Sequence, residues 1–351
     1  MKALCFFFLC SVINPLLATS TPPPPPPPFD ADLFRKEEQV VSGHLEFLYW
    51  TIEEGALDYA LKMNSPAWGN ALSDANYAQG HFQTAGYSFD PGMRLAFSFF
   101  RASRYWEVKW QYTRVTFRGS DEATAPTGTN EFLTATWPQI ISSPLTKATS
   151  HLHFNYNVFD ALLSRVFHPN PHLRIKMIGG PTAAWMSQQW IVHYLNGGGD
   201  NSRLNNQWSY AAGGLKLGTT VDWFWSTDFY VTATGFAGLF MGSYHNQSKQ
   251  TASTAPAGAV GSYDPSIPLK NAKLENIRAS FTAQMSLGPS WQKNFEHSRV
   301  EAFAGYEITI WTNLQELYRS TAGAPSASKQ TWLSTSLLAL HGISIRTSVD
   351  F

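Results

Sequence analysis

Apolar and polar positions alternate along the end of the chain, from Leu337 to Phe351. Successive side chains of a strand point to opposite faces, so every second residue belongs to one face. One face includes Phe351, Val349, Ile345 and Ile343, whereas the other carries mainly serine, arginine and aspartate. This segment is therefore predicted to be a strand with one apolar and one polar face. An edge strand of a soluble sandwich alternates in the same way.

The same alternation recurs upstream. It is clear in 93–99, 106–113, 151–158, 277–287 and 300–310, and noisier in 172–193, 206–222 and 228–243. Leu48 and Trp50 interrupt it in the first strand segment. Strands of soluble proteins usually have about five or six residues, whereas a membrane-crossing strand needs about 9 to 11. A soluble sandwich would also have to bury all these apolar faces in one core. The length of the strands therefore favours a transmembrane, antiparallel, up-and-down β-barrel, which is an all-β fold, over a soluble sandwich.

Short and long connections alternate between the predicted strands. Short turns lie near 101–104, 168–172, 224–228 and 293–298, and long polar stretches near 64–80, 118–149, 194–206, 244–272 and 313–333. Outer-membrane barrels have short periplasmic turns and longer extracellular loops. About ten strands result if 44–62 and 82–100 are one strand each. Twelve result if Glu54-Gly55 and Asp90-Pro91-Gly92 are turns.

Composition agrees with a barrel. Of the 351 residues, 44% are hydrophobic and only 14% are charged, whereas about a quarter of a soluble domain is charged. The 25 Lys and Arg residues balance 25 Asp and Glu residues, which argues against nucleic acid as a partner. No apolar run of about 18 residues occurs beyond the N-terminus, so spanning helices are not expected.

The N-terminus predicts export. Lys2, the apolar run Ala3 to Leu17 and small residues up to Ser20 form a signal peptide, 1–20. A lipoprotein signal ending at Cys10 is the less favoured alternative, because the apolar run continues past that cysteine. Cleavage leaves no cysteine, hence no disulfide. Residues 21–42 are predicted to be a Pro-rich periplasmic segment, in which seven consecutive prolines act as a stiff spacer. Residues 43–351 form the predicted outer-membrane barrel.

An ordered set of segments resembles the major-outer-membrane-protein-like, pore-forming family of Legionella and chlamydia-related bacteria. The set includes FLYWTIEEGALDYAL (47–61), FDPGMRLAFSFF (89–100), WEVKWQYTRV (106–115), LRIKMIGGPTAAWMSQQW (173–190) and EAFAGYEITIWTNL (301–314). The resemblance covers about 43–351 and implies a pore-forming barrel in the outer membrane. The chains of such barrels typically also end with an aromatic residue, as this chain does. By that resemblance, Ile343, Ile345, Val349 and Phe351 form an assembly signal for the barrel-insertion machinery. The disulfide-linked lattice of the cysteine-rich chlamydial protein is not carried over.

No catalytic, cofactor or metal motif is evident. His151 and His153 share a strand face, but two ligands are too few for a zinc site, and they are predicted to be polar residues of the lumen wall. The strand phases place a mixed set of charges on the lumen face, predicted to line a pore. The predicted pore-lining residues are Arg94, Glu107, Lys109, Arg174, Lys176, Lys216, Asp222, Arg278, Glu301, Glu307 and Arg346, and Asp350 shares their inward phase.

Two hypotheses follow. The first is a non-enzymatic, porin-like channel for passive diffusion of small hydrophilic solutes and ions, because rings of charge select ions by their field. The second is a structural or adhesive barrel with surface-exposed loops, whose mixed charges form a closed internal network. Ten or twelve strands fall between a filled barrel of eight and an aqueous channel of 16 to 18. Membrane lipid is an expected partner in both, and oligomerisation stays open.

Overall fold

The computed structural model describes residues 39–63, 80–101, 105–128, 131–137, 144–254, 262, 264–295, 298–320 and 331–351. The predicted signal peptide and most of the Pro-rich segment lie outside these residues. The first strand begins at Gln39, four residues before the expected start of the barrel at Gly43. No helix among the described residues is long and apolar enough to cross a membrane.

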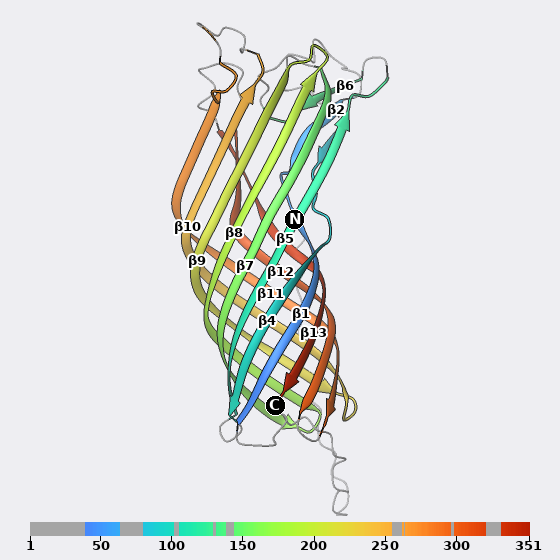
Figure 1. Ribbon diagram of the computed structural model, residues 1–351, viewed down its shortest axis with the longest axis vertical. Helices are drawn as coiled ribbons and strands as arrows, with labels where there is room; N and C mark the ends of the chain where they lie inside the picture. The colour runs from blue at the N-terminus through green and yellow to red at the C-terminus, as the bar shows by residue number, and fades with distance from the viewer. Residues whose placement is uncertain are drawn as a thin grey trace, which may run out of the picture.

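All regular elements in the described part of the chain are strands (Figure 1). They are β1 (Gln39–Glu54), β2 (Asp58–Met63), β3 (Gly80–Thr84), β4 (Asp90–Arg101), β5 (Trp106–Thr124), β6 (Phe132–Ala135), β7 (Leu145–Asn170), β8 (Leu173–Asn196), β9 (Asn201–Phe224), β10 (Phe229–Ala252), β11 (Lys270–Asn294), β12 (Arg299–Ser320) and β13 (Thr331–Asp350).

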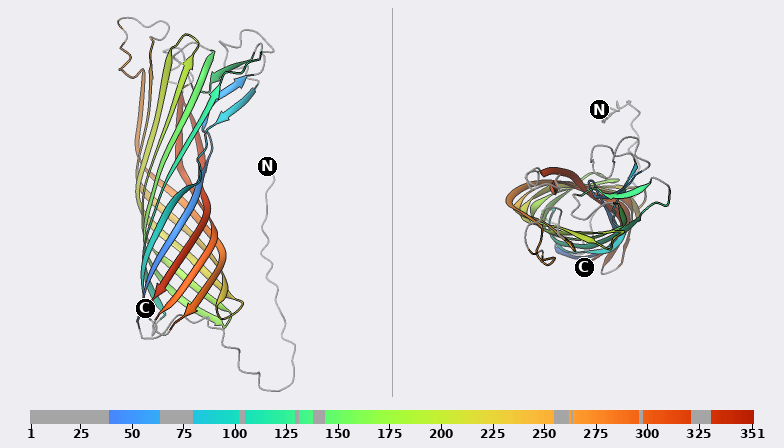
Figure 2. Two further views of the ribbon diagram at one scale, coloured as in Figure 1. Left: turned by 45° about the vertical axis from the view of Figure 1, so that its right-hand side comes forward. Right: turned by 90° about the horizontal axis from the view of Figure 1, so that it is seen from above.

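Ten of these strands form a closed antiparallel ring. Its order is β7-β5-β4-β1-β13-β12-β11-β10-β9-β8, and the pairing of β7 with β8 closes it. The first and last strands of the chain pair directly, with Phe47 opposite Ile345. Closure removes the sheet edges, so every barrel strand has two hydrogen-bonded neighbours. Figure 2 shows the closed wall from above.

Of the two counts that the sequence allows, ten barrel strands is the one observed. The predicted strand 44–62 is interrupted between β1 and β2, where Ala56 has a positive φ of 61°. The predicted strand 82–100 is likewise interrupted between β3 and β4. Asp90 and Gly92, however, lie inside β4 rather than in a turn. Strands β2, β3 and β6 form a small extension outside the ring, held to β7 through Leu133 opposite Leu145.

The two ends of the barrel differ. The turn end carries the start of β1, the end of β13 and the connections β4–β5, β7–β8, β9–β10 and β11–β12. The opposite end, called here the loop end, carries the longer connections. The prediction of a long loop at 194–206 is wrong. There β8 and β9 continue to a tight turn, 197–200, in which Gly199 has φ 87°. The polar composition of 194–206 reflects exposed strand ends, not a loop.

The outward face of the wall changes character partway along most long strands. On β5, Trp106 and Trp110 point outward near the turn end, whereas Arg114 and Arg118 point outward towards the loop end. The outward apolar part, called here the apolar band, surrounds the half nearer the turn end. It includes Leu45, Phe47, Leu95, Phe97, Trp110, Phe159, Leu163, Trp185, Leu215, Leu217, Leu239, Met241, Ile277, Phe281, Met285, Ile343 and Ile345. A continuous exposed apolar belt requires a surrounding such as lipid.

The inward face changes in the opposite sense. On β5, Glu107 points inward near the turn end, whereas Val115 and Phe117 are buried inside towards the loop end. Leu48 and Trp50 follow the same rule, which explains why they interrupt the expected pattern of β1. The barrel is therefore lipid-facing and polar inside in one half, and solvent-facing with an apolar interior in the other.

This exchange corrects the expected position of His151 and His153. Both lie in the half nearer the loop end, where Leu152 and Phe154 are the inward residues. His151 is exposed and His153 half-buried on the outer surface, so neither lies on the lumen wall.

The predicted faces of the C-terminal strand are observed. Ile343 and Ile345 are about half exposed on the outside, at 49% and 48%, while Ser344 and Ser348 are buried inside. Phe351 closes the strand and exchanges two backbone hydrogen bonds with Val41. The assembly role expected for this segment remains a prediction.

Candidate functional site: the two layers of the lumen

All eleven charged residues predicted to line the lumen lie on the inner face of the wall. Arg278 lies towards the loop end of β11, beside Tyr244, and the other ten lie in the half nearer the turn end. Together with their neighbours they form what is called here the charged layer. Nine of them surround one cavity of about 110 Å³. These nine are Arg94, Glu107, Lys109, Arg174, Lys176, Asp222, Glu301, Glu307 and Arg346.

Arg94 is the most fully paired of these residues. Its guanidinium donates two hydrogen bonds to the carboxylate of Glu307, at 2.7 and 3.0 Å. It also forms an ion pair with Glu46 at 3.0 Å, donates to the hydroxyl of Thr113 at 3.0 Å and stacks on Trp50. A bidentate arginine–carboxylate pair fixes both groups in orientation. Since β1 and β13 separate β4 from β12 in the ring, this contact bridges the lumen.

A second network lies against the turn end. Arg174 donates to Asp222 at 2.8 Å and lies 3.7 Å from Glu301, which belongs to a distant strand. Arg299 in turn contacts Glu301 at 3.0 Å and Asp350 at 2.5 Å. Each carboxylate thus lies against at least one guanidinium, as buried charges require.

Four further predicted charges contact neighbouring groups, and the first of them, Arg346, stacks on Phe303. Lys176 lies 3.3 Å from Glu107, and Lys216 lies 3.3 Å from Asp160. Arg278 stacks on Tyr244, with 3.7 Å between the guanidinium carbon and the ring centre. It does not contact Glu301, although both were predicted on the inner face of adjacent strands.

Sequence reasoning missed four inward residues of this layer, His44, Glu46, Asp160 and Arg299, the last of which shares the phase of Glu301 on β12. Glu46 pairs with Arg94, and Asp160 pairs with Lys216 and accepts a hydrogen bond from Thr182 at 2.6 Å. Glu46 and His44 share the phase of Ser42, and Asp160 shares the phase of Ser164. If the interior of the loop half is known to be apolar, the alternation along these strands identifies His44, Glu46 and Asp160 as inward residues.

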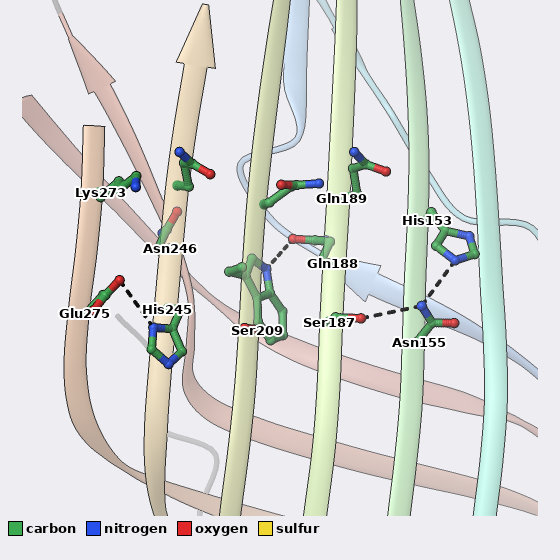
Figure 3. Close-up of a pocket in the computed structure, with 13 residues that line it drawn as sticks. His153, Asn155, Ser187, Gln188, Gln189, Ser209, His245, Asn246, Lys273 and Glu275 are labelled. Carbon is green, nitrogen blue, oxygen red and sulfur yellow. Dashed lines mark hydrogen bonds and ion pairs between the residues drawn. The ribbon is translucent and has the colours of Figure 1, made fainter. Parts of the chain in front are cut away.

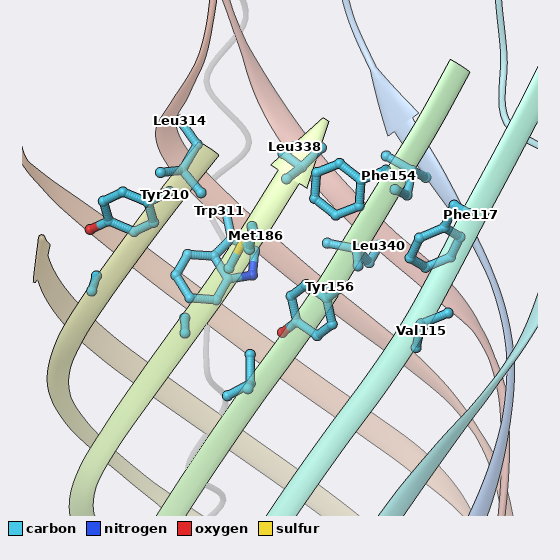
Figure 4. Packing of buried hydrophobic residues seen from close by; sticks show 14 of the residues in the cluster. Val115, Phe117, Phe154, Tyr156, Met186, Tyr210, Trp311, Leu314, Leu338 and Leu340 are labelled. Carbon is cyan, nitrogen blue, oxygen red and sulfur yellow. The ribbon is translucent and has the colours of Figure 1, made fainter. Parts of the chain in front are cut away.

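The interior towards the loop end is filled by an apolar cluster, called here the aromatic layer. It consists of Leu48, Trp50, Ile52, Val115, Phe117, Phe154, Tyr156, Val158, Ala184, Met186, Trp208, Tyr210, Ala212, Phe240, Tyr244, Trp311, Leu314, Leu338 and Leu340. Figure 4 shows part of this cluster, with labelled side chains that come from β5, β7, β8, β9, β12 and β13.

Rings from opposite walls touch in this layer. Tyr156 of β7 and Trp311 of β12 are separated by four strands in either direction around the ring, yet their ring centres are 6.4 Å apart. Trp311 also packs on Phe240 at 4.6 Å, and Phe154 packs edge-on against Trp208 at 5.6 Å. The contact between Tyr156 and Trp311 joins opposite walls across the interior, and burial of such rings stabilises the barrel by about 1.5–3 kcal/mol per large side chain.

One hydrogen-bond network lies at the loop side of the aromatic layer. The amide of Gln188 donates to Glu54 at 2.5 Å and to the hydroxyl of Tyr87 at 2.6 Å, and accepts from the indole of Trp208. Burial, and secondly the charge of Glu54, raise the pKa of Tyr87 well above its ordinary value. The phenol therefore stays neutral within this network.

No group of three or more metal-ligating side chains occurs among the described residues. In the charged layer, every carboxylate named above lies against a cationic side chain. Several of them also accept a hydrogen bond from a hydroxyl, such as Glu107 from Ser164 at 3.1 Å and Asp222 from Thr232 at 2.7 Å.

A family model described as the Legionella pneumophila major outer membrane protein precursor matches residues 37–351. No curated protein matches the chain significantly. Among solved structures, the chain is similar to the outer membrane protease OmpT from Escherichia coli, with 8% identity and a TM-score of 0.39, covering 89% of this chain and 96% of that one.

Two further similar structures are a Pseudomonas aeruginosa FadL homologue and the P. putida toluene transporter TodX. They show 8% and 9% identity, each with a TM-score of 0.25 and coverage of 90% of both chains. With TM-scores below 0.5, these similarities support no statement about activity.

Proposed function

The chain belongs to the family of the Legionella pneumophila major outer membrane protein precursor, and we propose that it is a barrel with a closed lumen that acts through its outer wall and loop end. It is a β-barrel of the bacterial outer membrane. The contact between Tyr156 and Trp311 carries the proposal, because it joins opposite walls across the interior. A filled aromatic layer leaves no aqueous path at this level.

The partners in this proposal follow from the outer surface. Outer-membrane lipid covers the apolar band, and the insertion machinery reads the terminal strand with Ile343, Ile345, Val349 and Phe351 outward or terminal. Catalysis is not part of the proposal, because the carboxylates of the charged layer are engaged in ion pairs.

Passive diffusion of small solutes or ions is the second candidate. It is favoured by the cavity of about 110 Å³ that nine of the predicted pore-lining residues surround. Cations and anions nearly balance around it, so the cavity by itself indicates no ion preference. Diffusion through the barrel would require the aromatic layer to separate.

Release of a small solute from loaded phospholipid vesicles tests the proposal. Vesicles that contain the unaltered barrel should empty no faster than protein-free vesicles. Trp311→Ala should accelerate release, because it removes the ring that joins Tyr156 to Phe240. A cavity of that size also costs about 3–5 kcal/mol of folding free energy, so folding is first verified by the mobility shift between unheated and heated protein.

Trp225→Ala is the matched control, because Trp225 is exposed in the turn between β9 and β10. It should leave release unchanged. Rapid release through the unaltered barrel would replace the closed-lumen proposal with passive diffusion.

A further inference from the structure

A hollow of about 420 Å³ lies on the outer surface of the wall and crosses five neighbouring strands, β7 to β11. Figure 3 shows polar side chains of its lining arranged across the neighbouring strands of the sheet. The outward residues that matter here are Asn155, Ser187, Gln189, Gln207, Ser209 and Gln247. This surface is called here the outer hollow.

The outer hollow directly adjoins the apolar band. On β8, Ser187 follows the outward Trp185, and on β11 Glu275 precedes the outward Ile277, which is 79% exposed. The hollow therefore lies on the loop side of the last lipid-facing residues. In an outer membrane, with the loop end outside, this is the level of the lipid head groups of the outer leaflet.

The lining has the chemistry of a saccharide site. Amides and hydroxyls supply both donors and acceptors, and they are already aligned by contacts within the sheet, such as Asn155 to Ser187 at 3.4 Å and Gln189 to Asn205 at 3.4 Å. The ionic groups are few: His245 lies 3.7 Å from Glu275, and Lys273 is the one lysine of the lining.

Other occupants fit this chemistry less well. A phosphate site would be expected to gather several cationic side chains. A protein interface would be expected to have an apolar core with aromatic residues. The outward lining has neither feature.

We propose that the outer hollow binds the saccharide head group of an outer-leaflet glycolipid, whose acyl chains lie against the adjoining apolar band at Trp185, Met241 and Ile277. The hollow supplies hydrogen bonds to the sugar hydroxyls, and the band supplies the apolar surface. This deepens the proposed function, because it names what the outer wall binds.

Binding is measured with the full-length barrel in phospholipid nanodiscs, titrated with lipopolysaccharide that carries a short core oligosaccharide. The same lipid without its sugar core and the free oligosaccharide are titrated in parallel. The barrel should prefer the sugar-bearing lipid over both. Gln189→Leu/Gln207→Leu should weaken its binding roughly tenfold, as expected for the loss of two hydrogen bonds of about 0.5–1.5 kcal/mol each.

Gln83→Leu is the control, because Gln83 lies on β3, outside the hollow. It should retain the preference for the sugar-bearing lipid. Equal binding of the lipids with and without the core oligosaccharide, or a preference that the double variant retains, would overturn the proposal. Free oligosaccharide that binds as tightly as the glycolipid would also overturn it and indicate a soluble sugar as the ligand. These results do not depend on lumen conductance, so failure here is distinct from failure of the closed-lumen proposal.

Discussion

An Arg94→Met variant is expected to lose about 3–5 kcal/mol of unfolding free energy, because removing one partner of a buried ion pair leaves the other charge unpaired. Arg94 is buried between Glu46 and Glu307. Methionine retains part of the volume but none of the hydrogen bonds, so both carboxylates would face each other in the lumen. Unfolding by urea in phospholipid vesicles measures the loss.

The double variant Arg94→Met/Glu307→Gln should recover part of this loss, since only Glu46 then remains charged at the site. Arg114→Met is the control on the neighbouring strand, because Arg114 is exposed on the outer surface. It should change stability by no more than about 0.5 kcal/mol. If Arg94→Met were as stable as Arg114→Met, the charged layer would be a hydrated channel wall rather than a closed network.

Leu239→Arg is expected to impair assembly severely, at a cost of about 2–4 kcal/mol for a charge facing the middle of the bilayer. Leu239 is 63% exposed in the apolar band, flanked by Leu215 on one neighbouring strand and Phe281 on the other. Ser243→Arg, on the same strand and the same face, should cost less than about 1 kcal/mol, because it lies at the boundary of the band.

The yield of folded barrel after refolding into vesicles compares the two variants. The two positions are four residues apart on β10, which is two repeats of the alternating pattern. Equal tolerance would therefore mean that the apolar band does not end between Met241 and Ser243. Such a result would also mean that the outer hollow does not lie at the level of the lipid head groups.

The fold was accessible from the sequence because alternation has a period of two whichever face is buried. That period gave the strands, their number and the inward phase of every predicted charge. It does not tell which face is inside, so His151 and His153 were assigned to the wrong side. The assignment failed because the surroundings of β7 change from lipid to water along its length.

Pairing within the lumen could not be predicted. Arg94 and Glu307 are 213 residues apart, and only closure of the ring brings them together. The aromatic layer was hidden for a related reason: its members, such as Tyr156 and Trp311, read as lipid-facing or irregular positions until the exchange of faces is known. The strands also extend well beyond a bilayer, which turned the expected loop at 194–206 into strand ends.

Single-channel recording of the unaltered barrel in a planar bilayer tests the closed lumen most directly. The charged layer and the aromatic layer together predict no steady current steps at any moderate voltage. Steady, ohmic steps whose reversal potential in a salt gradient shifts with Arg278→Glu would contradict this account and establish an open path along the predicted pore-lining residues.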